Sequence, residues 1–352
     1  MNAFARRLLE WFDQHGRQDL PWQHPRTPYR VWVSEIMLQQ TRVETVIPYF
    51  ERFMAAFPDL RTLATAAQDD VLHHWAGLGY YARARNLHRA AQMALAEHGG
   101  ELPDERAALE RLPGIGRSTA AAIIAQAHNR PEAILDGNAR RVLARHAGIH
   151  GWPGSTTTQR ALWQEAETRT PDTRCADYTQ AIMDLGALLC TRGTPACDRC
   201  PVHADCHAHA EGLTDVLPSP RPRRELPTRT RWAALLRSPE GVALSQRDPK
   251  GIWGGLYSLP EDDTPEGLES WVRARWPRAC ATNPDDALRH TFSHYHLDLR
   301  IRAFDLPAHA CGIMEGDRVI WYNPDTSRPV GIPAPIQRYL QHHKDPGNGT
   351  NR

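Results

Sequence analysis

Four cysteines within 17 residues constrain this chain more than any other feature of its sequence. Cys190, Cys197, Cys200 and Cys206 follow the pattern C-x6-C-x2-C-x5-C. In a chain that we expect to be cytoplasmic, clustered cysteines favour metal binding over disulfide bonds. Zinc held by four thiolates is one candidate, but zinc ribbons usually carry two C-x2-C pairs and this loop has one. The segment 190–206 is therefore predicted to be a tight metal-binding loop.

A second constraint is the stretch from Leu112 to Asn138, which reads L-P-G-I-G-R-S-T-A-A-A-I-I-A-Q-A-H-N-R-P-E-A-I-L-D-G-N. Gly114 and Gly116 allow a sharp turn and a close approach of the backbone to a ligand. The Ala-rich helix that follows directs free N–H groups at the turn, which suits a phosphate. Asp136 lies where a helix N-cap is expected, and a turn with a cap is also a common structural feature. We interpret the stretch as a grip on a DNA backbone beside a carboxylate that acts on the sugar.

Length and composition narrow the class of protein. The 352 residues suffice for two domains, and 41% hydrophobic with 24% charged residues is typical of a globular protein. No apolar run reaches the roughly 18–20 residues of a membrane helix. The first residues read as a helix and not as a targeting peptide, so we expect a cytoplasmic protein. No lysine precedes Lys250, which excludes a Schiff-base lysine from the part that carries the turn.

The pattern up to about residue 230 predicts helices only. A long helix is expected over 31–46, where Glu35 has apolar neighbours that should raise its pKa, although pairing with an arginine at the edge of the helix face is an equal alternative. Two helices are expected over 58–100. The loop between them, 77–87, reads G-L-G-Y-Y-A-R-A-R-N-L and could press an aromatic ring into a base stack, or hold a core tyrosine. Residues 137–190 continue as helix.

The pattern changes after a segment rich in Pro and Arg, 213–228, which reads as a linker. A β-hairpin over 231–247, a helix near 264–276 and a strand over 290–304 predict a second domain of α+β type, 229–342. The tail 343–352 is predicted to be disordered. The three isolated cysteines are predicted to be buried thiols: Cys175, Cys280 and Cys311.

Taken together, these motifs resemble the MutY family of adenine DNA glycosylases, within the helix-hairpin-helix DNA glycosylase superfamily. The resemblance covers nearly the whole chain and rests on S-E-I-M-L-Q-Q-T, G-L-G-Y-Y-A-R-A-R-N-L, L-P-G-I-G-R-S-T-A, L-D-G-N, D-L-G-A-L-L-C with its cysteine loop, and W-G-G-L-Y. It implies an all-α glycosylase domain over 1–212, with the hairpin at about 107–128. A smaller α+β, Nudix-like domain follows the linker. That domain lacks an R-E-x-x-E-E pattern, so we expect it to recognise a lesion and not to hydrolyse nucleotides.

The resemblance also implies roles for individual residues. Glu35 matches the acid that protonates adenine, Asp136 the carboxylate that stabilises the sugar cation, and Asn138 a residue that orients the site. The residues matched to DNA backbone or base-stack contacts are Gln40, Tyr80, Gly114, Gly116 and Ser118. Those matched to the adenine pocket are Trp22 and Leu38, and those matched to contacts with 8-oxoguanine are Phe292, Ser293 and His294. The 190–206 loop matches a [4Fe–4S] site, and hairpins of this family often bind a monovalent cation.

The activity so implied is hydrolytic removal of adenine mispaired with 8-oxoguanine or guanine in double-stranded DNA, by a bacterial, nucleoid-associated monomer without membrane contact. The adenine must be flipped out before a side chain can reach it. Glu35 would donate a proton as a carboxylic acid still neutral near pH 7. Asp136 would keep a low pKa through N–H donors and the helix dipole.

Two alternatives remain open at this point. One is a bifunctional endonuclease III type of glycosylase and lyase, which carries a lysine in the pattern L-P-G-x-G-x-K. Ser118 stands at that position, which argues against strong lyase activity. The other is a DNA-binding module without catalysis. The presence of both Glu35 and Asp136 in matching motifs argues against this second alternative.

Overall fold

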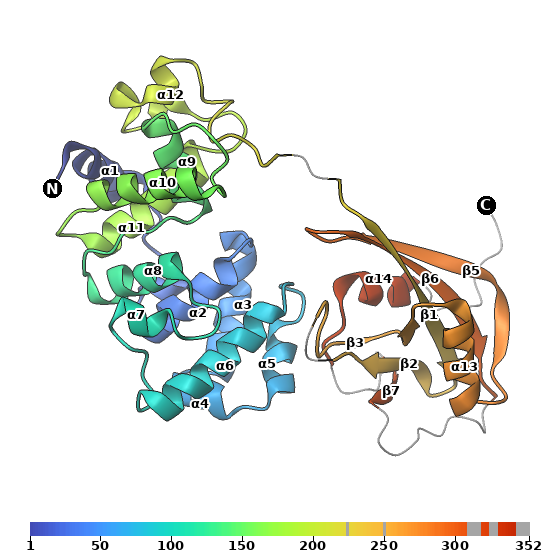
Figure 1. Ribbon diagram of the computed structural model, residues 1–352. Helices are drawn as coiled ribbons and strands as arrows, with labels where there is room; N and C mark the ends of the chain where they lie inside the picture. The colour runs from blue at the N-terminus through green and yellow to red at the C-terminus, as the bar shows by residue number, and fades with distance from the viewer. Residues whose placement is uncertain (223–224, 249–250, 308–317, 324–329, 343–352) are drawn as a thin grey trace. The chain divides into compact units, whose positions relative to one another are not determined.

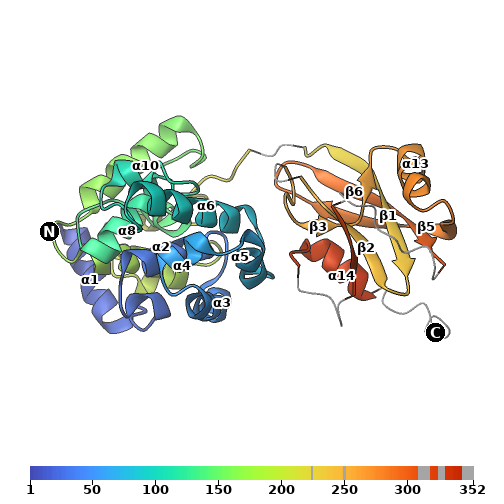
Figure 2. The ribbon, with the colours of Figure 1, turned by 90° about the horizontal axis from the view of Figure 1, so that it is seen from below.

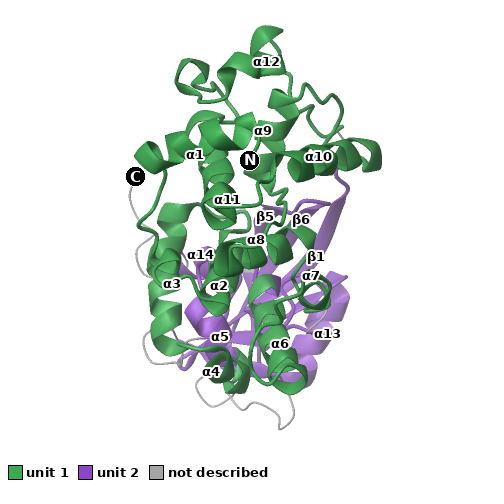
Figure 3. Ribbon diagram, turned by 90° about the vertical axis from the view of Figure 1, so that its left-hand side faces the viewer, with its two compact units in different colours: residues 1–68, 83–223 green, residues 69–82, 224–352 purple. Residues whose placement is uncertain are grey.

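The computed structural model describes residues 1–222, 225–248, 251–307, 318–323 and 330–342. Contacts divide the chain into two compact units (Figure 3). Unit 1 comprises Met1–Gln68 and Arg83–Arg223, and unit 2 comprises Asp69–Ala82 and Arg224–Arg352. Residues 69–82 thus group with the C-terminal part, whereas the predicted domains 1–212 and 229–342 divide the chain at the linker alone. These predicted boundaries stay a prediction, and the predicted tail 343–352 lies outside the described residues.

Unit 1 is helical throughout its described residues, as the pattern predicted (Figure 1). Its helices are α1 (Ala3–His15), α2 (Pro28–Leu38), α3 (Val43–Ala56), α4 (Leu60–Thr65), α6 (Ala82–Glu97), α7 (Arg106–Leu109), α8 (Arg117–His128), α9 (Gly137–His146), α10 (Thr156–Arg169), α11 (Cys175–Asp184) and α12 (His207–Ala210). Short 3-10 turns lie at Pro21–Gln23, Cys197–Arg199 and His203–Asp205, and a π-helical turn lies at Leu185–Leu189. Helix α5 (Gln68–Trp75) lies almost wholly in the segment that groups with unit 2.

The predicted long helix over 31–46 is wrong, because α2 ends at Leu38 and α3 begins only at Val43. The buried guanidinium of Arg83 supplies the physical reason. Its Nη1 donates to the carbonyl oxygens of Ile36, Met37 and Gln39 at 3.0, 2.7 and 2.6 Å, and these are acceptors that a continuing helix would use itself. Gln40 then adopts a left-handed backbone conformation with φ of 60°. The chain is therefore redirected directly after α2.

Helix α2 lies at the centre of unit 1 because most of its surface is apolar. Thr27 caps its first turn, Pro28 occupies the first helical position, and Val31, Trp32 and Val33 are fully buried. It packs against α8, which is rich in alanine. A second core joins α1, α9, α10 and α11 through buried side chains that include Leu8, Leu143, Leu162 and Ile182. Together these cores fix the N-termini of α8 and α9 at one site.

The described residues of unit 2 form a mixed sheet of seven strands, with the order β3-β2-β1-β6-β5 and with β4 beside β1 and β7 beside β2. Strand β1 runs parallel to β6, whereas β5 and β6 form an antiparallel pair. The strands are β1 (Thr228–Ser238), β2 (Gly241–Gln246), β3 (Tyr257–Ser258), β4 (Glu261–Asp262), β5 (Cys280–Thr291), β6 (His296–Asp305) and β7 (Val319–Tyr322). The predicted β-hairpin is confirmed, since β1 and β2 pair in antiparallel register.

Helices α13 (Pro265–Arg275) and α14 (Ala334–His342) each close an apolar core on the sheet (Figure 2). Ala233 and Leu235 of β1 pack in one core with Ile336 of α14, whereas Ala234 and Leu236 pack in the other with helix α13. This alternation is the period of two that a strand imposes on its side chains. The predicted helix near 264–276 is confirmed.

The predicted single strand over 290–304 is wrong. It contains the end of β5, a turn at 292–295 and the start of β6, and the Phe292 N–H donates to the Tyr295 carbonyl at 2.9 Å to close that turn. Phe292 and Tyr295 pack in the same core although they are three residues apart, so the period of two that a strand imposes is broken at this turn. The predicted contact loop of Phe292, Ser293 and His294 thus lies at the tip of a hairpin.

In the ranges that the structure describes, no helix has both the length and the apolar character needed to cross a membrane.

Candidate active site

A cavity of about 870 Å³ in unit 1 brings together residues predicted for catalysis, for the adenine pocket and for DNA contact. It lies where the end of α2, the start of α8 and the start of α9 meet. Seven residues that the sequence singled out line it: Trp22, Glu35, Leu38, Gln40, Ser118, Asp136 and Asn138. Glu35 and Asp136, which lie 101 positions apart in the sequence, therefore share one cavity because α2 packs on α8.

Glu35 projects from α2 into this cavity. Its Oε1 accepts a hydrogen bond from Nε2 of Gln126 on α8 at 2.9 Å. Burial raises the pKa of Glu35 to about 7, the Gln126 bond lowers it, and the charge of Asp136 raises it further. The predicted rise is thus confirmed, and the partner is an amide and not an arginine. A carboxyl group with a pKa raised toward neutral pH suits a proton donor.

Asp136 is the N-cap of α9, as predicted. Its Oδ2 accepts from the Asn138 N–H at 3.1 Å and its Oδ1 from the Ala139 N–H at 2.8 Å. The predicted low pKa is wrong, because burial raises the pKa of Asp136 more than these two donors and the nearby Arg141 and Arg140 lower it. The Asp136 carboxylate therefore accepts two hydrogen bonds, but these bonds and the nearby positive charges do not offset the cost of burying its negative charge. A cation placed beside it would be stabilised.

Asn138 is fixed from two sides. Its Oδ1 accepts from Nη2 of Arg141 at 2.8 Å, and the same guanidinium donates to the carbonyl oxygens of Gly186 and Cys190 at 2.6 Å each. A Cβ on Gly186 would lie 2.6 Å from the Cβ of Asn138, so only glycine fits there. Asn138 is thereby held against the π-helical turn that leads into the cysteine loop.

The Pro-Gly-x-Gly turn leads into α8 as predicted, but its two glycines differ. Gly114 has a φ of 82°, and a Cβ there would lie 3.0 Å from the Cβ of Asn86, so the turn requires glycine. Gly116 has an ordinary extended conformation, and no atom lies within 4 Å of the position of its Cβ. The sharp turn therefore depends on Gly114, whereas Gly116 leaves an open approach to the N-terminus of α8.

Ser118 holds the segment that leads into Asp136. Its Oγ accepts from the Leu135 N–H at 3.0 Å, directly before Asp136. The hydroxyl thus ties the first turn of α8 to the N-cap of α9. Replacement of this short side chain would leave the buried Leu135 N–H without that partner.

Sequence reasoning missed a polar network at the wall of the cavity. Asp184 is fully buried and accepts from Nη2 of Arg17 at 2.6 Å and from Nε2 of Gln180 at 2.8 Å. Arg17 and Gln180 line the cavity, so this network forms part of its wall. The π-helical turn also places Leu188 in the lining, with 45% of this apolar residue exposed. Position in the sequence gives no signal for these residues, because their proximity to Glu35 arises only in the fold.

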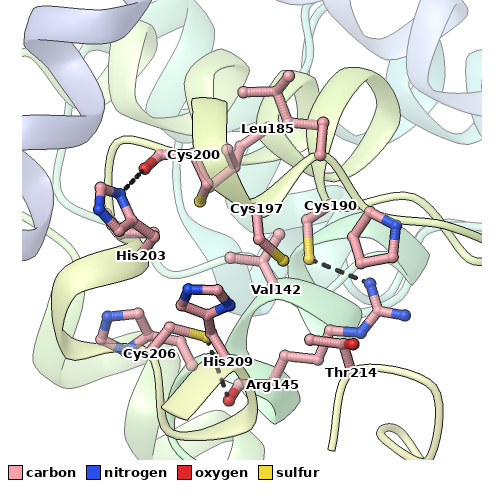
Figure 4. A pocket seen from close by; sticks show the side chains of 15 residues that line it. Val142, Arg145, Leu185, Cys190, Cys197, Cys200, His203, Cys206, His209 and Thr214 are labelled. Carbon is pink, nitrogen blue, oxygen red and sulfur yellow. Dashed lines mark hydrogen bonds between the residues drawn. The ribbon is translucent and has the colours of Figure 1, made fainter. Parts of the chain in front are cut away.

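The four clustered cysteines line a second cavity in unit 1 (Figure 4). Nη1 of Arg145 donates to Sγ of Cys190 at 3.4 Å, and Sγ of Cys206 donates to the Arg145 carbonyl oxygen at 3.7 Å. Among the described residues, no group of three His, Cys, Asp or Glu side chains is arranged to hold a metal ion. Of the isolated cysteines, Cys175 is buried, Cys280 is exposed in contrast to its prediction, and Cys311 lies outside the described residues.

The remaining predicted residues lie in unit 2. Tyr80 has a φ of 49° and is 61% exposed. Ser293 and His294 are exposed at the hairpin tip, and Phe292 packs against Trp253 with 5.3 Å between ring centroids. The predicted roles of these residues stay predictions.

Two family models match the chain. A model of the HhH-GPD superfamily of base excision DNA repair proteins matches residues 33–168, and a model of the NUDIX domain matches residues 231–342. The chain is 35% identical over 341 residues to the adenine DNA glycosylase of Buchnera aphidicola subsp. Acyrthosiphon pisum, with 97% of each chain covered. It is 41% identical over 413 residues to that of Rattus norvegicus, covering 99% of this chain and 80% of the relative.

Solved structures agree with the helical fold. A thermostable thymine-DNA glycosylase has a TM-score of 0.54 at 28% identity, over 59% of this chain and 95% of its own. Endonuclease III in a non-covalent DNA complex has a TM-score of 0.51 at 20% identity, over 60% of this chain and 95% of its own. The second likeness shows the fold alone.

Proposed function

Because the chain belongs to the adenine DNA glycosylase family, whose members hydrolyse N-glycosidic bonds in base excision repair, we propose that it removes adenine mispaired with 8-oxoguanine or guanine. One observation carries the proposal. Glu35, with a pKa raised to about 7, shares a cavity with Asp136, a carboxylate held by backbone N–H donors. Two carboxyl groups in different environments are the arrangement that glycosidic hydrolysis requires.

The first step is to bring adenine into the cavity. A base inside a duplex is inaccessible, so the nucleotide must be flipped out at a cost of a few kcal/mol. In the proposal, Gln40 and Tyr80 enter the base stack and compensate for lost stacking. Trp22 and Leu38 contact the faces of the adenine, and the donors Arg17 and Gln180 approach its edge.

Departure of adenine then needs a proton. Neutral adenine is a poor leaving group, and N7 is accessible to an acid. Glu35 donates its proton to N7, and electrons of the glycosidic bond move onto the protonated base as the bond breaks. The deoxyribose that remains in the DNA is then an oxocarbenium ion, and its positive charge lies beside Asp136. Burial raises the pKa of Asp136 because it destabilises the ionised carboxylate. The sugar cation forms only during the reaction, so its attraction to this carboxylate stabilises the transition state more than the bound substrate.

Water completes the hydrolysis. Glu35, now ionised, can accept a proton from water as the oxygen bonds to C1′, or Asp136 can bond C1′ first and be displaced by water. Both routes give the same products: free adenine and an abasic site. Asn138 orients the site, because Arg141 fixes its amide against the backbone of Gly186.

The DNA backbone is gripped at the hairpin. Backbone N–H groups at Gly114, Gly116 and Ser118 face a phosphate in the proposal, with a monovalent cation bound to the carbonyl oxygens of the same turn. The opposite strand carries the 8-oxoguanine, which Phe292, Ser293 and His294 contact from unit 2. We propose that the chain acts as a monomer on chromosomal DNA in the bacterial cytoplasm, with double-stranded DNA as its partner.

The donor set of the cysteine loop fits a [4Fe–4S] cluster. Four thiols around one cavity, with the Arg145 guanidinium donating to Sγ of Cys190, match the ligands and the charge compensation that such clusters need. Cys190, Cys197, Cys200 and Cys206 would hold the cluster. When bound, the cluster would hold the loop 190–206 rigid. Arg141 and Arg145 of α9 hydrogen-bond to Cys190 at the start of this loop.

The test of this function compares the wild-type protein with Asp136→Asn. Asparagine keeps the N-cap of α9, so the variant should fold, while the negative charge is lost. We expect adenine release from a duplex with adenine opposite 8-oxoguanine to fall by more than about 100-fold. Release at the wild-type rate would overturn the role of Asp136. Borohydride trapping on an abasic duplex separates this function from a lyase, because an efficient covalent adduct would indicate an amine nucleophile.

A further inference from the structure

A second cleft, of about 650 Å³, opens beside the catalytic cavity in unit 1. It lies between the N-terminus of α8, the start of α9 and one side of α10, from Thr156 to Glu167. Ser118 and Thr119 line both the cleft and the catalytic cavity, so the two are adjacent. A strand that places one nucleotide in the catalytic cavity must leave along an adjoining surface.

The cleft carries positive charge in excess. Arg117, Arg140 and Arg160 line it, with Glu167 as the carboxylate of the same lining. Glu167 is engaged, because it pairs with Arg117, whose guanidinium also stacks on Trp163 with 3.8 Å to the ring centroid. Two arginines are therefore left without a carboxylate in the lining.

These two arginines differ in how they are held. Arg140 donates from Nη2 to the Leu135 carbonyl oxygen at 3.3 Å, and its buried Nε has no hydrogen-bond partner among the described residues. Arg160 is exposed on α10, and its side chain makes no hydrogen bond or ion pair within the described ranges. Arg140 thus supplies a fixed charge at the back of the cleft, and Arg160 supplies a donor at its mouth.

Uncharged donors surround Arg160. Thr156 and Gln159 lie in the first turn of α10, are exposed, and line the same cleft. Ser155 caps the helix, so the free N–H end of α10 also favours an anion here. A guanidinium with neighbouring hydroxyl and amide donors suits a phosphate oxygen.

We propose that this cleft binds phosphodiester groups of the adenine-bearing strand next to the flipped nucleotide, with Arg160 as the residue that contacts a phosphate. The identity of the strand rests on the proposed function. The cleft extends the DNA path from the hairpin at α8 onto α10. Arg140 contributes through its field and Arg160 through direct contact.

The experiment maps phosphate contacts by charge removal. Duplexes with an uncleavable 2′-fluoro analogue of deoxyadenosine opposite 8-oxoguanine would each carry one neutral methylphosphonate, placed at successive positions of the adenine strand. Affinities would be measured for the wild-type protein, for Arg160→Ala and for Arg89→Ala. Arg89 is an exposed arginine on α6 that does not line the cleft, so it controls for net charge.

We expect Arg160→Ala to bind the unmodified duplex about fivefold more weakly and to lower the slope of log K against log salt by about 0.9. At one position, the methylphosphonate should weaken DNA binding by the wild-type protein and by Arg89→Ala. The same methylphosphonate should not weaken DNA binding by Arg160→Ala any further. An interference pattern for Arg160→Ala identical to that of the wild type would overturn the proposal. Binding does not depend on base release, so absence of adenine release would count against the proposed function and leave this test intact.

Discussion

Gln126 on α8 donates a hydrogen bond to Glu35 on α2, with Nε2 2.9 Å from Oε1, and this bond stabilises the ionised form of a carboxyl group whose pKa burial raises to about 7. The two helices thus set the proton affinity of the group that we propose as the acid. Burial raises the affinity of Glu35 for its proton, and the hydrogen bond from the amide lowers that affinity.

The first prediction concerns the pH dependence of base release. The rate should fall by about tenfold per pH unit above roughly pH 7, because only protonated Glu35 can donate. Gln126→Leu removes the amide donor, so it should raise the pKa of Glu35 and move this falling limb up by about one pH unit. Single-turnover rates between pH 5 and 9 check this. A limb that moves to lower pH in the variant would contradict it.

The second prediction separates chemistry from binding. Glu35→Gln keeps the size of the side chain but cannot donate a proton to N7, so adenine release should fall by about 100-fold to 10,000-fold. Affinity for the mispaired duplex should stay within about threefold of the wild type. The measurements are single-turnover release and a duplex binding curve. Parallel loss of release and binding would mean that Glu35 is a structural residue.

The third prediction concerns stability and follows from proton linkage. The folded pKa of Glu35 is raised from 4.5 to about 7, so the folded state binds the proton more tightly than the unfolded state. The stability so gained is fully present below pH 4.5 and is lost as the pH rises through 7. The free energy of unfolding of the wild type, relative to Glu35→Gln, should therefore decrease by about 3 kcal/mol over this range. Urea titrations of both proteins at pH 4.5 and 8 check this; a constant difference would contradict it.

The fourth prediction concerns the cysteine loop. The purified protein should be brown and absorb visible light, with about four irons per chain, because four thiols surround one cavity. Cys200→Ser should lose most of this absorption, whereas Cys280→Ser, which changes an exposed cysteine outside the loop, should keep it. A colourless preparation that contains zinc would overturn the cluster assignment.

The sequence predicted the parts of the site that depend on local chemistry. The turn at Gly114, the N-cap at Asp136 and the apolar setting of Glu35 follow from residue types at short spacing, and the structure confirms each of them. The family likeness then supplied roles that spacing alone could not assign.

The parts that sequence reasoning missed depend on contacts between distant residues. The end of α2 at Leu38 is set by Arg83, which lies 45 residues further along the chain, and no local signal at Gln40 reveals it. The pKa of Asp136 depends on how deeply the fold buries its carboxyl group, so its cap donors alone gave the wrong direction. Nothing in the sequence distinguishes Gln126 from the other residues of its Ala-rich helix. Its contact with Glu35 follows from the packing of α8 on α2.

The most direct test is single-turnover base release from three duplexes: adenine opposite 8-oxoguanine, adenine opposite guanine, and thymine glycol opposite adenine. We expect free adenine from the first two duplexes, strand breaks only after alkali, and no release of thymine glycol. Release of thymine glycol with direct strand scission would identify a bifunctional glycosylase and lyase. Absence of release from all three would show that Glu35 and Asp136 are structural residues of a DNA-binding protein.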